Sequence, residues 1–202
     1  MPALHLPNDY YDLPPGKLVN LVTCLEMTKN PQVMPPQWPG DCRLQRFRPD
    51  DLAAFRSLFR AIGQDLLWFS RLTMPDEKLA AILGDPEIEC FALVKNGLNI
   101  GLLELNFTAQ TDCELAFFGL IPSEVGTGLG RLLMQEATAR AWTRPISRCW
   151  VHTCHYDHPK ALSFYQRAGF KPYKLMLEVH DDPRLSGHLP PKAAPHVPLL
   201  KP

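Results

Sequence analysis

Three glycines in one short segment, Gly126, Gly128 and Gly130, could bind a phosphate group. A strand-like run and Pro122 precede them, and a helix-like pattern follows from about Leu129. Glycine lets backbone N–H groups approach an anion, and the N-terminus of a helix adds a favourable positive potential. The spacing matches neither the dinucleotide G-x-G-x-x-G fingerprint nor the G-x-x-x-x-G-K-S/T loop. Taken alone, the segment also suits a tight turn that caps a helix.

A second motif, H-P-K-A-L-S-F-Y-Q-R-A-G-F, spans residues 158–170. Pro159 suits the first turn of a helix, and Gly169 suits its end. Together with residues 125–130, the motif resembles the GNAT superfamily of N-acetyltransferases. In that family Q/R-x-x-G-x-G/A follows a strand, and N-x-x-A-x-x-x-Y-x-x-x-G-F forms a later helix. The resemblance covers roughly residues 43–180, with both motifs in the family's order.

The resemblance implies an α/β fold with a mixed, mostly antiparallel sheet flanked by helices, and acetyl-CoA as the acyl donor. Its pantetheine arm would lie where the strand ending near Ile121 separates from the strand at Trp150, and would bond free backbone groups. Two positions depart from the family pattern. Val125 replaces Gln or Arg, a loss that Arg131 could partly offset, and His158 replaces Asn. The expected acetyl-CoA site comprises Gly119, Leu120, Ile121, Val125, Gly126, Thr127, Gly128, Leu129, Gly130, Arg131 and His158.

Two carboxylates are candidates for a general base, because an alkylamine has a pKa of about 10.4 and must lose a proton before attack. Glu114 precedes the glycine-rich segment at a spacing that resembles the catalytic glutamate of GNAT histone acetyltransferases. Strand alternation predicts that Glu114, Ala116 and Phe118 share one face. A hairpin would bring Glu104 and Asn106 to that same face, where the two carboxylates could raise each other's pKa. Alternatively, either carboxylate lies at a solvated edge or pairs with Lys or Arg.

Tyr165 is the candidate general acid. The resemblance places it where a phenol can protonate or hydrogen-bond the departing CoA thiolate. The alternative is a core aromatic on a helix that also buries Leu162 and Phe164.

The acceptor site is expected near the loop between the first two helices, where Trp68 and Phe69 could form an aromatic wall. Both aromatics equally suit the core. His155 or His158 could also line the site. No metal is expected, because His152 and Cys154 share one strand face while His155 points to the other. A covalent relay through Cys154 is less favoured, since no His/Asp partner is evident.

The elements that would position these residues follow from hydrophobic periodicity and from turn residues. The order is strand, two helices, three antiparallel strands, helix, strand, helix and strand, with an extra strand possible before Pro31. Expected strands cover 43–47, 88–95, 100–107, 113–121, 147–154 and 173–179, with the extra one at 18–27. Expected helices cover 52–62, 75–83, 129–142 and 159–169.

Composition suits a single globular domain with two arms. Prolines concentrate in residues 1–42, taken as an N-terminal arm, and in 181–202, taken as a tail that could fold over the site or mediate dimerisation. The acetyltransferase domain would occupy residues 43–180. Lys plus Arg and Asp plus Glu number 21 each, and no basic stripe or polybasic cluster favours nucleic acid or a membrane surface as partner. The six cysteines, without C-x-x-C or a secretory signal, favour reduced thiols and a cytoplasmic location.

These features predict an N-acetyltransferase that transfers an acetyl group to a primary amine of a small molecule or peptide by direct attack in a ternary complex. A protein acetyltransferase is a second enzymatic hypothesis. A non-catalytic acyl-CoA-binding sensor or interaction module on the same fold is an alternative from another class. A homodimer is possible.

Overall fold

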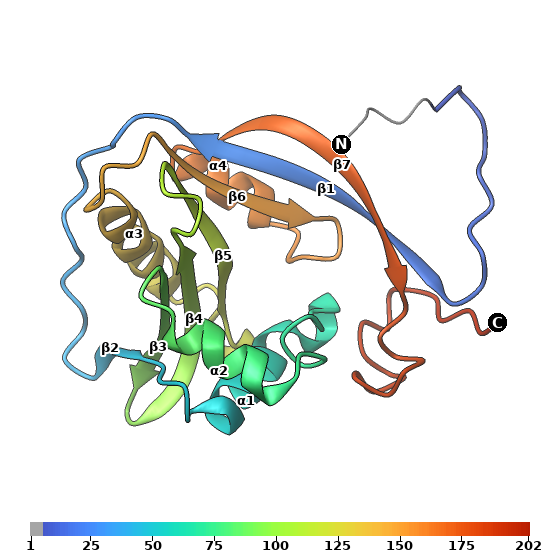
Figure 1. The fold of residues 1–202 in the computed structure, drawn as a ribbon, viewed down its shortest axis with the longest axis horizontal. Coiled ribbons are helices and arrows are strands. Elements are labelled where there is room, and N and C mark those ends of the chain that lie inside the picture. Colours follow the sequence, from blue (N-terminus) through green and yellow to red (C-terminus); the bar gives the residue numbers. More distant parts are fainter. Residues whose placement is uncertain (1–5) are drawn as a thin grey trace.

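A computed structural model describes residues 6–202, in which seven strands form one sheet in the order β2-β3-β4-β5-β6-β1-β7 (Figure 1). Neighbouring strands are antiparallel except β5 and β6, which are parallel. The strands are β1 (Lys17–Met27), β2 (Cys42–Arg46), β3 (Ile88–Lys95), β4 (Leu98–Asn106), β5 (Asp112–Leu120), β6 (Arg148–Cys154) and β7 (Lys171–Asp181). The helices are α1 (Leu52–Gly63), α2 (Asp76–Gly84), α3 (Leu129–Ala141) and α4 (Ala161–Arg167), with 3-10 turns η1 (Gln64–Leu66) and η2 (Pro122–Glu124).

The expected fold class and element order are confirmed. The extra strand expected before Pro31 is β1, and it lies between β6 and β7 inside the same sheet. The boundaries of the three proposed segments remain predictions. No helix in the part of the chain that the structure describes is long and apolar enough to cross a membrane.

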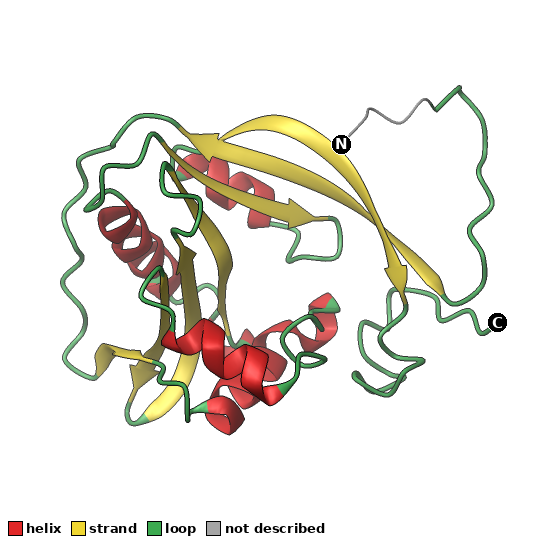
Figure 2. Ribbon diagram, viewed as in Figure 1, coloured by secondary structure: helices red, strands yellow, loops and turns green. Residues whose placement is uncertain are grey.

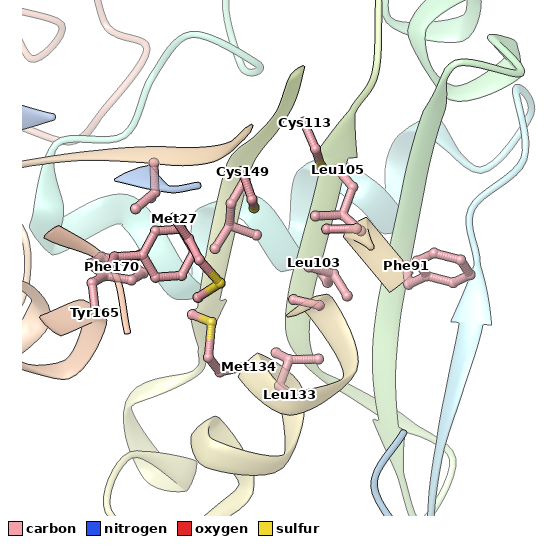
Figure 3. Packing of buried hydrophobic residues seen from close by; sticks show 14 of the residues in the cluster. Met27, Phe91, Leu103, Leu105, Cys113, Leu133, Met134, Cys149, Tyr165 and Phe170 are labelled. Atoms are coloured by element: carbon pink, nitrogen blue, oxygen red, sulfur yellow. The ribbon is translucent and has the colours of Figure 1, made fainter. Parts of the chain in front are cut away.

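The helices cover the two faces of the sheet (Figure 2). Helices α1 and α2 pack on one face through apolar residues such as Phe55, Phe59 and Leu79, which meet Leu102 of β4. Helices α3 and α4 pack on the other, where Leu133 and its neighbours meet the strands (Figure 3). Successive residues of a strand point to opposite faces, so β4 supplies both cores in turn.

A β-bulge in β5 changes which residues share a face with Glu114. Leu105 pairs with Leu115, but Glu104 pairs with Phe117, so Ala116 is an extra residue in the strand. Phe118 pairs with Leu103 and packs in the core on the other face, so the expectation that it shares the face of Glu114 is wrong. Phe117 takes that position, and it contributes to the core beneath α1 and α2. Glu104 does lie on this face, as expected.

The segment after β7 has a core of its own, although it contains no helix or strand. Arg184 and Asp182, both buried, form an ion pair at 2.6 Å. The Arg184 guanidinium also donates to three backbone carbonyls, those of Ala193, Val197 and Pro198. Apolar residues held around it pack on Leu67 of the α1–α2 loop: Leu189, Ala193, Ala194 and Val197. Residues 182–202 thus brace that loop.

Candidate active site

A gap opens between β5 and β6 because their pairing is short. It ends at Glu114 and Trp150, although β5 continues to Leu120 and β6 to Cys154 (Figure 1). The predicted separation of these strands is confirmed. Backbone groups along the facing edges beyond Glu114 have no strand partner there, so they can bond a ligand in the gap.

The residue whose backbone faces the gap can be identified from the ladder. The N–H of Ile121 donates to Ile100 O of β4 at 2.9 Å, and Gly119 pairs with Leu102 two residues earlier. Ladder bonds alternate along an antiparallel strand, so the N–H and C=O of Leu120 point away from β4 and toward the gap. The pantetheine arm was expected to bond the backbone of Gly119, Leu120 and Ile121. The ladder leaves Leu120 free for this, whereas Gly119 and Ile121 face β4.

Gly119 allows α1 and the Trp68 ring to pack closely on β5. A Cβ at this position would lie 2.6 Å from Cγ2 of Ile62 and 3.4 Å from Cη2 of Trp68. Any side chain here would push the end of α1 and the Trp68 ring away from the sheet. Gly119 thereby sets how closely the α1–α2 loop approaches the gap.

The glycine-rich turn presents free N–H groups at the start of α3. Gly126 and Gly128 have φ values of +88° and +92°, a region that other residues rarely adopt. Among the described residues, the backbone N–H groups of Gly126, Gly128, Leu129 and Gly130 have no protein acceptor. A Cβ built on Gly126 or Gly128 meets nothing within 4 Å. This cluster of donors fits a pyrophosphate at a helix N-terminus.

The residues next to the glycine-rich turn are of two kinds: some are exposed, and others stabilise the conformation of the turn. Val125 and Arg131 are exposed. The Thr127 hydroxyl donates to Glu124 O at 2.8 Å, and Lys95 pairs with the Glu124 carboxylate at 3.1 Å. The turn is therefore anchored to β3.

His158 lies in the turn before α4. Its Nδ1 accepts the N–H of Lys160, two residues further on, at 3.1 Å. This bond accounts for its position before the helix.

Glu114 lies where the two strands part. Its Oε1 is 3.8 Å from Nδ1 of the exposed His152, and its side chain is 24% exposed. Burial raises the pKa of the Glu114 carboxyl, an effect that the charge of His152 partly opposes. The carboxyl combines contact with solvent and a raised pKa, which suits a proton acceptor.

Glu104 is fully buried beneath the same face. Its carboxylate forms an ion pair with the guanidinium of Arg71, whose side chain lies over the ring of Phe117 with a Cζ-to-centroid distance of 5.0 Å. Burial raises the pKa of Glu104, and Arg71 opposes this. Glu104 is therefore the carboxylate that pairs with an arginine, as the alternative interpretation expected. This ion pair fixes the α1–α2 loop to β4.

Tyr165 lies in the apolar core, close to Phe170 (Figure 3). Its ring centroid is 6.3 Å from that of Phe118 on β5 and 6.2 Å from that of Phe170. Burial raises the pKa of its phenol, with a smaller contribution from the Asp157 carboxylate. The phenol therefore keeps its proton at neutral pH and can donate it.

Asp157 is a site residue that sequence reasoning did not single out. Its Oδ1 accepts the indole N–H of Trp68 at 3.0 Å, and its Oδ2 accepts the Thr153 hydroxyl at 2.7 Å and the Cys154 N–H at 3.0 Å. Trp68 also contacts Phe117, with ring centroids 5.4 Å apart. The only sequence signal was a carboxylate soon after the end of β6.

The other expected acceptor residues lie elsewhere. Phe69 lies against His180 of β7, with the ring planes tilted and the centroids 4.9 Å apart. The ring of His155 accepts the N–H of Leu21 at 3.0 Å and lies against Tyr156. The structure therefore brings Trp68, but neither Phe69 nor His155, to the face that carries Glu114.

Cys154 is unsuited to a covalent relay. Burial, followed by the nearby Asp157 charge, raises the pKa of its thiol to about 11, so little thiolate forms at neutral pH. Within residues 6–202, no group of three or more His, Cys, Asp or Glu side chains gathers as metal ligands would.

A sequence model of the acetyltransferase (GNAT) family matches residues 53–170. No curated protein matches the sequence. The fold is similar to that of a GCN5-related N-acetyltransferase from Sphaerobacter thermophilus, with a TM-score of 0.57 and 18% identity, covering 81% of this chain and 52% of that one. The chain thus spans about half the length of that protein.

Two shorter structures are covered almost completely. An acetyltransferase from Thermus thermophilus has a TM-score of 0.51 and 21% identity, over 69% of this chain and 96% of that chain. An aminoglycoside acetyltransferase from an uncultured soil metagenomic sample, in complex with sisomicin, has a TM-score of 0.52 and 16% identity, over 64% and 88%.

Proposed function

The chain belongs to the acetyltransferase (GNAT) family, and we propose that it transfers an acetyl group from acetyl-CoA to a primary amine of a small molecule. One observation carries the proposal. The gap between β5 and β6 has Glu114 at its closed end, and β5 leads from there to the free N–H groups that begin at Gly126. A phosphate-bearing acyl donor and a proton acceptor therefore have places on one continuous path.

The donor site suits acetyl-CoA. The free N–H groups of Gly126, Gly128, Leu129 and Gly130 would bind the pyrophosphate. The backbone of Leu120 would bond the pantetheine arm in place of a neighbouring strand. These contacts need only backbone groups, so the substitution of Val125 for Gln or Arg leaves them intact.

Glu114 is the proposed general base. An amine in the gap attacks the thioester carbonyl only as the neutral form, and Glu114 accepts the proton that the nitrogen must lose. A new C–N bond forms, the C–S bond breaks, and the electron pair leaves on sulfur. Glu104 is assigned a positioning role, because its carboxylate is buried and bound to Arg71.

Tyr165 is the proposed general acid. The thiolate that leaves needs a proton, and the Tyr165 phenol, which is protonated at neutral pH, can supply it. Its ring contacts Phe118, whose backbone, like that of Leu120, belongs to the edge of β5 that faces the gap. Direct attack in a ternary complex is favoured over a relay through Cys154, because burial raises the pKa of that thiol to about 11.

A small molecule is the favoured acceptor because the loops around Trp68 are held in place. Trp68 and Arg71 both belong to the α1–α2 loop. Asp157 binds Trp68 to the loop after β6, and the ion pair of Arg71 with Glu104 holds the α1–α2 loop on β4. The tail braces it from outside, where Asp65 accepts the N–H of Ala194 at 3.3 Å. A fixed aromatic wall suits the carbon stem of a small amine better than a broad polypeptide surface. The aminoglycoside acetyltransferase among the similar structures supports this class.

Mass spectrometry of reactions with acetyl-CoA tests the acceptor class, with free polyamines, amino sugars and lysine-containing peptides offered at equal concentration. Acetylation of small amines in preference to peptides supports the proposal. Preferential acetylation of peptides contradicts the small-molecule assignment, and acetyl-CoA binding without any product favours the sensor.

A further inference from the structure

Strand β7 has an unusually apolar exposed surface at the edge of the sheet. It pairs with β1 alone, and no backbone group elsewhere in residues 6–202 bonds to it. On one side Leu175, Leu177 and Val179 are 66%, 46% and 58% exposed. Leu21, which pairs with Leu177 across the ladder, is also exposed. Exposed edge strands of this kind are templates for pairing with another strand.

The sequence of β7 is complementary to itself when reversed about Met176. Lys174 and Glu178 lie two residues on either side of Met176, with opposite charges. Leu175 and Leu177 lie one residue on either side and are both apolar. A second, antiparallel copy would therefore meet every one of these residues with a suitable partner.

We propose that two copies of this chain pair through β7, antiparallel about a two-fold axis at Met176, and join their sheets into one. Lys174 then faces Glu178 of the partner subunit, and Leu175 faces Leu177 of the partner subunit. Such an interface uses the same patch on both subunits, as two-fold symmetry requires. Cross-strand pairs of opposite charge and of apolar residues stabilise antiparallel ladders.

The local structure accommodates this pairing. Among the described residues Lys174 has no ion-pair partner, and Glu178 accepts an Asn20 amide proton through Oε2 alone at 2.8 Å, which leaves Oε1 available. The ladder with β1 is regular from Lys174 onward, and the bulge falls just before it, at Tyr173. Strands β1 and β6 separate β7 from the gap, so this inference is independent of the proposed function.

A charge exchange on β7 tests the pairing. Sedimentation velocity and light scattering of the full chain should show a dimer whose population rises with protein concentration. Lys174→Glu converts two attractive pairs into two repulsive ones and should raise the dimer dissociation constant about 30-fold. Lys174→Glu with Glu178→Lys restores opposite charges and should return the constant to within about threefold of wild type. Lys78→Glu, an equal charge change on exposed α2, is the matched control and should change nothing.

Circular dichroism first establishes that the variants are folded. Each of the following outcomes then supports or overturns pairing through β7. Loss of the dimer in Lys174→Glu and recovery in the double variant support antiparallel β7 pairing. A wild-type protein that is monomeric at every concentration overturns it. So does a dimer that tolerates Lys174→Glu as well as Lys78→Glu, or one that the double exchange fails to restore.

Discussion

The indole N–H of Trp68 donates to Oδ1 of Asp157 at 3.0 Å and joins the loop after α1 to the loop after β6. These loops come from distant parts of the sequence and lie on either side of the gap between β5 and β6. The same carboxylate also fixes Thr153 and the backbone of Cys154. This partly buried hydrogen bond therefore sets the distance between the Trp68 ring and β6.

Trp68→Phe should loosen this wall. The ring can still pack on Phe59 and Phe117, but the Asp157 carboxylate loses a donor, at a cost of about 1.5 kcal/mol in the free energy of unfolding. We expect a higher KM for the amine and an unchanged KM for acetyl-CoA. Trp142→Phe is the control, because its buried indole nitrogen has no partner to lose. Equal destabilisation of the two variants in urea unfolding would show that the bond to Asp157 contributes little.

Gly128→Ala tests the phosphate-binding turn. The backbone at φ +92° is unfavourable for alanine by about 1 kcal/mol, and the new methyl group would project into open space that we assign to phosphate oxygens. Calorimetry should show acetyl-CoA affinity at least about tenfold weaker. Gly97→Ala shares the positive φ and the open space but lies in the β3–β4 turn, so it should lose similar stability and no affinity. Equal affinities for the two variants would place the pyrophosphate elsewhere.

Glu114→Gln should have opposite effects on activity and stability. A base works only when ionised, so turnover of the wild type should fall as pH drops through the raised pKa of Glu114, and the variant should lack this dependence. Ionising a partly buried carboxyl costs stability above its folded pKa. The variant should therefore melt at a higher temperature than wild type at pH 8. That gain should vanish below about pH 4, where the carboxyl is protonated in both states. A wild-type rate profile retained by the variant would exclude Glu114 as the base.

Tyr165→Phe should separate turnover from binding. The variant keeps the packing against Phe118 and Phe170 but cannot donate a proton, so kcat should fall about 100-fold while acetyl-CoA affinity is unchanged. Tyr10→Phe, at a fully exposed tyrosine, is the control and should retain full activity. Full activity in Tyr165→Phe would show that Tyr165 is not the general acid and contributes only to packing in the core.

Local patterns were sufficient to predict most of the elements. Hydrophobic periodicity defined α1 and α3, and turn residues defined the β3–β4 hairpin, where Asn96 and Gly97 both have positive φ. The glycine-rich turn was found in the same way, because its function depends on backbone conformation that glycine encodes directly.

Long-range features could not be predicted. The bulge at Ala116 follows from the pairing of β4 with β5, which alternation along β5 alone does not encode. The partners of Glu104 and Trp68 are Arg71 and Asp157, and both pairs form only after the α1–α2 loop packs on the sheet. The tail has no periodicity, and its order depends on the buried Arg184–Asp182 pair.

The central claim is most directly tested by measuring CoA release from acetyl-CoA by the purified chain, with and without a panel of primary amines. The account predicts that acetyl-CoA binds, that release depends on the amine, and that Glu114→Gln greatly reduces release while binding persists. Failure of acetyl-CoA to bind, or binding with no amine-dependent release across the panel, would contradict it.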